Sequence, residues 1–484
     1  MIETTGSNFA ANGNTTLGIN GLHKATVQKV NMDNNQRSNI GYLGRASYSY
    51  DDRYFFTGSY RRDGASVFGV NQKWGDFFAF GGAWRLSSEK FMSSISYLDD
   101  LKLKVSWGKN GNQGLDPYGT LSTINNGASG GVRYEFGGSD IIYGLNQKAL
   151  GNADLGWETT ESWNTGFESA WLGSRLFVDL DLYFSKTTDQ IFTRDIPVMT
   201  GFKNMKSSMG QVNNRGVELT IRSVNINTQD WYWTTNLTFW LNRNKLVHLY
   251  GEDLNGDGKE DDDISNSRFI GKPLGAIYGY QQDGIVQETD IEYMKANGAT
   301  PGIPKYKDMD NDGVITSADR VILGYSTPNF KLNMSNTITY KNWDLYFMLT
   351  GTFGGGGYYQ KSNKGAYLTN GSGRFNTNGI YIPWWTPENK SNEYPAATFN
   401  DDGGRFLGLQ NRAFVRLQDV TLSYTFREPW VQKVNIQNLK VFFTAKNLFT
   451  ITKWLGGDPE VGVTVSENTY PVLTSFSLGA NISF

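Results

Sequence analysis

The chain has 484 residues and a formal net charge of -2. It contains no cysteine, which excludes a disulfide framework, thiolate catalysis and a cysteine-ligated metal. The small net charge argues against nucleic-acid binding by bulk electrostatics, and the two histidines, His23 and His248, are too few for a multi-histidine zinc site. No apolar run reaches the roughly 18 residues of a membrane-spanning helix, but membrane strands, which show lipid only every second residue, stay open.

Alternating apolar and polar residues recur from residue 40 to the end of the chain. In LKLKVSW, residues 101–107, every second residue is apolar, which is typical of a half-buried strand. A share of 14% aromatic residues, together with 56 glycines, also favours strands and turns over helices. We therefore expect an all-β fold with thirteen strands, at residues 40–50, 53–62, 76–88, 98–109, 158–170, 174–187, 213–224, 230–243, 329–340, 342–353, 412–426, 437–449 and 472–484.

The expected strands are long, and their connectors are sorted by length. Most strands exceed the roughly 5 to 6 residues usual in soluble proteins and reach the roughly 9 to 11 that a membrane strand needs. Tight turns alternate with long loops, of which the longest are 110–157, 244–328 and 354–411. A transmembrane antiparallel up-and-down β-barrel of the outer membrane predicts this alternation, with tight periplasmic turns and long extracellular loops. A soluble Greek-key sandwich does not.

The strand count also predicts where the ends of the chain belong. By alternation the last strand, which ends on Phe484, runs to the periplasmic rim. The first strand then starts outside, so residues 1–39 are expected to be an extracellular loop segment or a truncated start. Thirteen is odd, whereas single-chain bacterial barrels have even strand numbers. We therefore expect residues 40–484 to be the C-terminal part of a larger barrel, with Phe484 as its natural end.

Seven stretches in this order resemble the C-terminal barrel half of SusC/RagA-type TonB-dependent transporters of Bacteroidota. They are YDDRYFFTGSYRRDGASVFG (50–69), WGDFFAFGGAWRLSSEKFM (74–92), LKLKVSWGKNGNQG (101–114), GQVNNRGVELTI (210–221), PWWTPENKSNEYPAA (383–397), FVRLQDVTLSYTF (414–426) and NLFTITKWLGGDPEVG (447–462). The resemblance implies a barrel of about 22 strands, of which this chain holds thirteen, around an N-terminal plug that this chain lacks.

The same resemblance implies a function and a set of partners. Such transporters import oligosaccharides or peptides across the outer membrane of a Gram-negative bacterium, and this chain would supply barrel wall and extracellular loops. The implied partners are a SusD-like lipoprotein lid, the TonB–ExbB–ExbD complex acting through the plug region, and the barrel-assembly machinery. Two alternatives stay open: a passive porin-like channel, which would differ in having no plug, and a secreted carbohydrate-binding β protein.

No enzyme is predicted. Asp179 and Asp181 resemble a glycosidase pair in composition, but on a barrel strand they are expected to point into a polar lumen. The run Gly354 to Gly357 lacks a following Lys-Ser or Lys-Thr and so does not match a phosphate-binding loop.

The segment DMDNDGVITSAD, residues 308–319, has the spacing of a Ca²⁺ loop. Carboxylates at its first, third and fifth positions and a glycine at its sixth match the oxygen ligands and the sharp turn that Ca²⁺ requires. The predicted ligands are Asp308, Asp310, Asp312, Val314 through its carbonyl, Thr316 and Asp319. The alternative is a solvated acidic turn, which we favour for the related segment DLNGDGKEDDD, residues 253–263, because Ile264 stands at its twelfth position.

Four aromatic residues cluster in one expected extracellular loop: Tyr381, Trp384, Trp385 and Tyr394. Flat rings there could stack on a sugar, hold a peptide or contact a lid protein, and the alternative is that the loop packs on itself. Trp231 and Trp233, near the expected periplasmic rim, suit the aromatic girdle of a membrane barrel.

Overall fold

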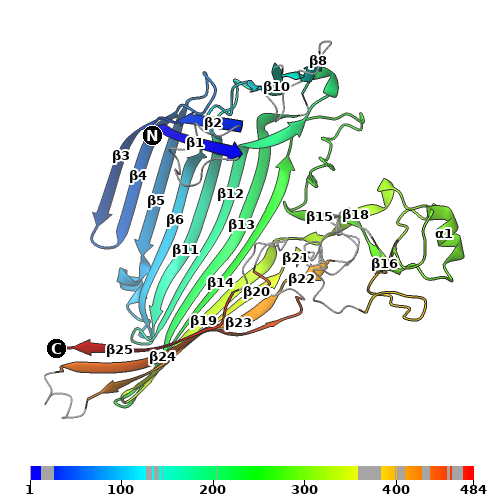
Figure 1. Cartoon of the computed structure of the whole chain (residues 1–484). Coiled ribbons are helices and arrows are strands. Elements are labelled where there is room, and N and C mark those ends of the chain that lie inside the picture. Colours follow the sequence, from blue (N-terminus) through cyan, green and yellow to red (C-terminus); the bar gives the residue numbers. More distant parts are fainter. Residues whose placement is uncertain are drawn as a thin grey trace.

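The computed structural model describes residues 2–11, 27–126, 133–135, 141–143, 145–202, 204–357, 383–397, 399, 409–427, 436–454, 458–460 and 472–484. Its main feature is one curved antiparallel sheet of 13 strands (Figure 1). In order across the sheet the strands are β3 (Asn39–Tyr50), β4 (Tyr54–Ala65), β5 (Trp74–Arg85), β6 (Leu98–Asn112), β11 (Glu158–Trp171), β12 (Leu176–Asp195), β13 (Asn204–Asn227), β14 (Trp231–His248), β19 (Pro328–Tyr340), β20 (Trp343–Gly354), β23 (Phe414–Phe426), β24 (Asn438–Thr452) and β25 (Ser475–Ser483).

The sheet is an up-and-down meander, because each strand pairs with the sheet strands before and after it in the chain, and the edge strands β3 and β25 pair with one neighbour each. The thirteen predicted strands are confirmed one for one. The largest boundary differences are at β12 and β13, which run on to Asp195 and start already at Asn204. A β-bulge between Thr187 and Gln190 shifts the register there and breaks the alternation that the sequence prediction followed. Within the described residues, no helix is long and apolar enough to cross a membrane.

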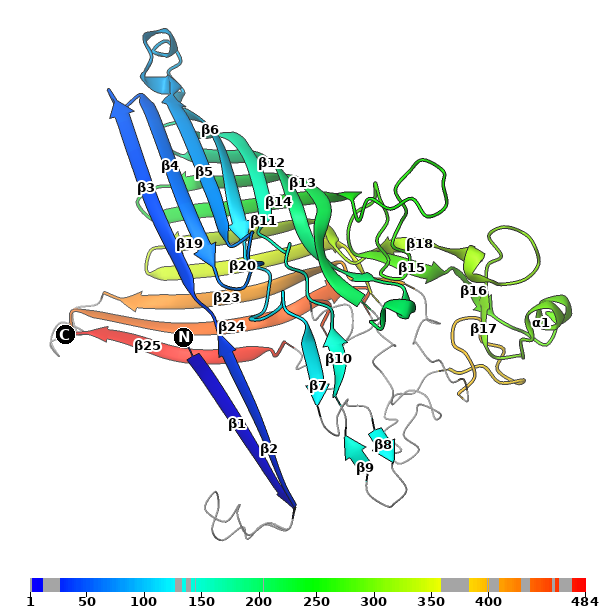
Figure 2. The ribbon, with the colours of Figure 1, turned by 90° about the horizontal axis from the view of Figure 1, so that it is seen from above.

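Smaller elements gather beyond one end of the sheet strands (Figures 1 and 2). They form two-stranded pairs: β1 (Ile2–Ala11) with β2 (Val27–Gln36), β7 (Thr123–Asn126) with β10 (Leu145–Ala149), β8 (Arg133–Glu135) with β9 (Ile141–Tyr143), β15 (Ala276–Tyr280) with β18 (Arg320–Tyr325), β16 (Gln282–Ile285) with β17 (Pro304–Tyr306), and β21 (Gly356–Gly357) with β22 (Gln410–Asn411). Helix α1 spans Ile291–Asn297. The segment 1–39, expected to be loop, thus contains the hairpin β1–β2.

The two ends of the sheet carry different connectors. At one end, called the short-turn end, lie the connectors 51–53, 86–97, 172–175, 228–230 and 341–342, together with the described residues 427 and 436–437. At the other, the long-loop end, lie the connectors 66–73 and 249–327. The described residues between β6 and β11, between β12 and β13, between β20 and β23, and between β24 and β25 lie there too. The alternation of length is not strict, since 86–97 is longer than 66–73. Two 3₁₀ turns, Leu86–Ser88 and Lys90–Met92, lengthen that connector.

The two faces of the sheet differ in chemistry. One row of paired residues, from β6 to β19, is apolar: Leu103, Phe167, Leu180, Leu219, Phe239 and Leu332. The next row, on the opposite face, is Lys104, Gly166, Asp181, Glu218, Trp240 and Lys331. On the polar face, side chains two strands apart bond one another, as with Tyr183 and Asn242 at 3.0 Å, which indicates that the sheet curls toward that face. We call the polar face inner and the apolar face outer.

Large apolar side chains on the outer face are exposed, with Trp163 at 52%, Phe443 at 46% and Leu478 at 79%. At the short-turn end this face carries an aromatic belt, made up of Tyr50, Tyr54, Trp84, Tyr97, Trp171, Trp231, Tyr340, Trp343 and Tyr424. Neighbouring rings contact one another, as at Trp231 and Tyr340, whose centroids are 4.3 Å apart. An apolar outer band bordered by aromatic residues is the surface of a membrane barrel.

The two clusters of buried apolar residues in the described part of the chain lie at the long-loop end, because a single-layer sheet has no interior of its own. One cluster consists of Ala65, Val67, Phe68, Leu115 and Leu155. The other, between the ends of β12, β13 and β14, consists of Phe192, Val212, Leu246 and Leu249, with Tyr250, Ile270 and Leu274 packed against it. These clusters attach the long loops to the sheet.

Candidate functional site

The inner wall contains an ion-pair cluster at the place where β6, β11 and β12 run side by side. The Lys104 ammonium lies 2.7 Å from an oxygen of Asp179 and 2.8 Å from one of Asp181. Lys102 pairs with Glu168 at 2.5 Å, and Glu168 also lies 3.6 Å from Lys104. Gly166 on the intervening strand leaves room for Lys104 to reach across. Asp179 and Asp181 therefore act as partners of a lysine in the wall, as expected for lumen residues.

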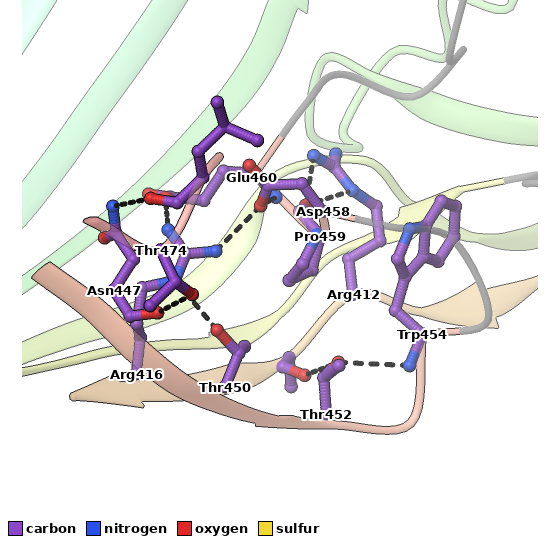
Figure 3. A network of polar contacts seen from close by, with 12 residues as sticks. Arg412, Arg416, Asn447, Thr450, Thr452, Trp454, Asp458, Pro459, Glu460 and Thr474 are labelled. Atoms are coloured by element: carbon purple, nitrogen blue, oxygen red, sulfur yellow. Dashed lines mark hydrogen bonds and ion pairs between the residues drawn. The ribbon is translucent and has the colours of Figure 1, made fainter. Parts of the chain in front are cut away.

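A second polar network, which the sequence reasoning missed, fixes the connector between β24 and β25 (Figure 3). Arg416 of β23, only 4% exposed, donates to Asp458 at 2.8 Å and to Thr450 of β24 at 2.9 Å, and it also pairs with Glu460. Arg412 donates to the Pro459 carbonyl at 2.7 Å. Arg416 and Thr450 are cross-strand partners, so residues 458–460 bind on their side of the sheet. The signal was an arginine within an apolar strand, followed along the chain by Asp-Pro-Glu.

The predicted Ca²⁺ loop brings three of its carboxylates together. Oxygens of Asp308, Asp310 and Asp312 lie within 4.8 Å of one another, and among the described residues no other three acidic or histidine side chains come this close together. Asp308 accepts from the backbone N–H groups of Asn311 at 2.6 Å and Gly313 at 2.7 Å. Asn311 and Gly313 have φ of 63° and 86°, the left-handed conformation that wraps the chain around the carboxylates.

Asp319 closes this loop from inside. It is fully buried, and its two oxygens accept from the N–H groups of Thr316 and Met309, both at 2.7 Å. These backbone hydrogen bonds, first that from Thr316, lower the pKa of Asp319 below its usual range. The hydroxyl of Thr316 accepts from the Ala318 N–H at 3.1 Å, and Val314 donates its N–H to Asp312 at 2.8 Å.

The three clustered carboxylates repel one another. The N–H of Asp312 lowers the pKa of Asp310, but partial desolvation and the charges of Asp312 and Asp319 outweigh it, so the pKa is raised overall. The loop thus concentrates negative charge at one point of the surface.

The related segment 253–263 has the same backbone geometry but a different closure. Asp253 accepts from the N–H groups of Gly256 at 2.7 Å and Gly258 at 2.9 Å, as Asp308 does from Asn311 and Gly313. Here Asp261 closes the loop, accepting from the Leu254 N–H at 2.6 Å and the Asn255 amide at 2.8 Å. The first part of the two loops is therefore shared, whereas the three-carboxylate cluster belongs to 308–319.

The aromatic residues predicted to contact a ligand or partner differ in their burial. Trp385 is 8% exposed, donates its indole N–H to Gln287 at 2.9 Å and lies against Gly302, where a Cβ would come within 2.6 Å of its ring. It therefore fastens the loop 383–397 to the segment that carries α1, which belongs to a different long connector. Trp384 and Tyr394 are half-buried, and burial raises the pKa of Tyr394. Tyr381 lies outside the described residues.

Comparison with known proteins gives a consistent result. A family model described as TonB dependent receptor-like, beta-barrel matches residues 3–448. The TonB-dependent receptor SusC of Bacteroides thetaiotaomicron is 30% identical over 96% of this chain and 45% of its own length. TonB-dependent receptor P3 of Formosa agariphila is 29% identical over 93% of this chain and 46% of its own length.

A solved structure of the RagAB peptide transporter superposes with a TM-score of 0.75 at 24% identity, covering 95% of this chain and 49% of that one. This likeness shows the fold. The chain spans about half the length of the curated relatives it matches.

Proposed function

Because this chain belongs to the TonB dependent receptor-like β-barrel family, we propose that it forms the wall and the outer loops of an energised outer-membrane importer. Proteins of this family reside in the outer membrane of Gram-negative bacteria, and the family consists of receptors and transporters rather than enzymes. The observation that carries the proposal is the sheet itself, whose outer face is apolar and bordered by the aromatic belt and whose inner face is charged.

In this proposal the short-turn end faces the periplasm and the long-loop end faces the outside. The loops and a SusD-like lipoprotein capture an oligosaccharide or a peptide, and TonB with ExbB and ExbD supplies the energy for its passage along the inner wall. Ion pairs such as Lys104 with Asp179 and Asp181 give this wall a polar surface without a large net charge. A polar surface suits hydrated substrates, which pass only if the wall replaces part of their hydration.

Uptake by whole cells tests this proposal. Fluorescent oligosaccharides and peptides are offered to the host bacterium with and without the intact gene, and each strain is measured with and without a protonophore. We expect uptake of at least one class to require both the gene and the proton-motive force. Uptake that needs the gene but persists with the protonophore would establish the passive channel, and a gene-independent uptake of both classes would refute the importer.

We also propose that the loop 308–319 binds Ca²⁺ and thereby stiffens the long connector 249–327. In support, three carboxylates converge, the chain is already wrapped around them, and Asp310 carries a raised pKa that a cation would relieve. The Val314 carbonyl and the Thr316 side chain complete the oxygen set, while Asp319 holds the loop in shape.

Calorimetric titration of the purified protein with CaCl₂ tests the Ca²⁺ proposal. We expect one site with a Kd on the order of 0.1 to 1 mM, as in extracellular modules. Asp310→Asn combined with Asp312→Asn should abolish it, whereas the matched change Asp257→Asn in the second loop should leave it unchanged. The absence of binding heat in the unmodified protein, or loss of the site in Asp257→Asn alone, would refute the assignment to 308–319.

A further inference from the structure

One connector at the short-turn end is longer than the tight turns beside it and projects beyond the ends of its two strands (Figure 2). It spans residues 86–97 between β5 and β6 and contains the two 3₁₀ turns (Figure 1). Glu89 fixes it in place: one carboxylate oxygen accepts from the Tyr54 hydroxyl at 2.7 Å and from the Trp84 indole N–H at 3.1 Å, and the other lies 3.7 Å from Arg53. The Glu89 side chain is only 15% exposed.

Those contacts place Glu89 on the outer face of the sheet, whereas Ser87, at the start of the connector, bonds Asp100 on the inner face at 2.6 Å. Tyr54 and Trp84 are cross-strand partners, and Trp84 pairs with Leu103 of the apolar outer row. Tyr54 and Trp84 are also members of the aromatic belt, with ring centroids 6.3 Å apart. A carboxylate bound to both therefore holds the connector against the belt from outside the barrel.

The connector carries two exposed aromatic side chains. Phe91, two residues after Glu89, is 64% exposed, and the side chain of Lys90 beside it is exposed as well. Tyr97, at the other end of the connector, is 58% exposed and stacks on Trp171 of the belt with ring centroids 5.9 Å apart. An exposed aromatic ring next to a lysine, on a connector that is fixed to an aromatic belt, is the composition of a membrane-interface anchor.

We propose that the connector 86–97 is an interfacial anchor whose occupant is the phospholipid layer at the short-turn end. Phe91 lies at the boundary between headgroups and acyl chains, and the Lys90 ammonium reaches toward the lipid phosphates along its own flexible stem. Lipid is the occupant because the anchor is continuous with a surface that lipid already covers. The assignment of this layer to the periplasmic leaflet rests on the orientation given under the proposed function.

The absence of cysteine makes site-directed spin labelling the direct test. A nitroxide is attached at Phe91→Cys in the protein inserted in phospholipid vesicles, and its collisions with oxygen, which prefers lipid, and with a water-soluble nickel chelate are compared. Two controls are labelled in the same way: Phe443→Cys on the outer face, 46% exposed, and Leu254→Cys in the acidic loop, 83% exposed.

We expect the ratio of oxygen to nickel collisions at residue 91 to be several-fold above that at residue 254 and to approach that at residue 443. A ratio equal to that at residue 254 overturns the anchor. Protection from both reagents would point to a covering protein and would also overturn it. If residue 443 itself reads as aqueous, the membrane assignment of the outer face fails, which is a failure of the proposed function and distinguishable from failure of the anchor.

The positioning role of Glu89 has its own readout. Glu89→Ala removes the contacts to Tyr54 and Trp84, so the label at residue 91 should become more mobile and its collision ratio should fall toward the aqueous value. Ser88→Ala, one residue away and exposed, serves as the matched control and should change neither. An unchanged label in Glu89→Ala would show that the connector is held by something other than this carboxylate.

Discussion

At the residue scale, Asp319 holds the loop 308–319 closed through hydrogen bonds to its backbone. Its spacing predicts a Ca²⁺ ligand, yet both of its oxygens accept backbone N–H groups of the same loop. These bonds lower its pKa relative to the unfolded value of about 3.9. A lowered pKa stabilises the loop at every pH above the unfolded value, and this stabilisation is lost as the pH falls through the folded pKa.

We therefore predict that the amides of Met309 and Thr316 lose protection from hydrogen exchange as the pH falls below about 4, after correction for intrinsic exchange rates. Asp319→Asn keeps one acceptor but has no titrating group, so these amides should exchange faster at neutral pH and show no acid-dependent step. An acid step of the same size in Asp319→Asn would assign the titration to another carboxylate of the loop.

At the element scale, pairing of the central strands depends on a glycine under an aromatic ring. Tyr183 of β12 lies over Gly216 of β13 and donates its hydroxyl to Asn242 of β14, so one side chain spans three strands. A Cβ at Gly216 would overlap both the Tyr183 ring and the Leu241 carbonyl oxygen. The ring can rotate away, but the carbonyl belongs to the β14 backbone and cannot move without breaking the ladder.

Gly216→Val is therefore predicted to destabilise the barrel by about 1 to 3 kcal/mol or more through overpacking. The measurement is the folded fraction in outer membranes, read from the heat-dependent mobility of the barrel on gels. Gly81→Ala is the matched control, because a Cβ at that position meets Ser106 at an ordinary 3.8 Å. Tyr183→Phe should cost far less than Gly216→Val, and equal losses in the two variants would mean that the hydroxyl, not the ring, sets the pairing.

At the scale of the whole molecule, alternation in the sequence predicted the thirteen strands, their order and the two faces. This was possible because the architecture of a membrane barrel follows directly from strand periodicity and loop length. The bulge beyond Thr187 and the 3₁₀ turns at 86–92 were missed, since both interrupt a period of two. The cluster of Asp308, Asp310 and Asp312 could be predicted because these residues are close together in the sequence. The network of Arg416 with Asp458 could not, because its members come from separate segments that only the fold brings together.

Three neighbouring strands, β12, β13 and β14, have 20, 24 and 18 residues, whereas about 9 to 11 suffice to cross a bilayer. In the proposed orientation the additional residues of these strands extend on the extracellular side of the membrane. They form a wall on the order of 25 Å tall, given roughly 3.3 Å per residue and a tilted strand. Electrostatic screening at physiological salt acts over about 8 Å. A solute that meets the loops at this height is therefore selected by charges of the protein, beyond the reach of those on the lipid headgroups.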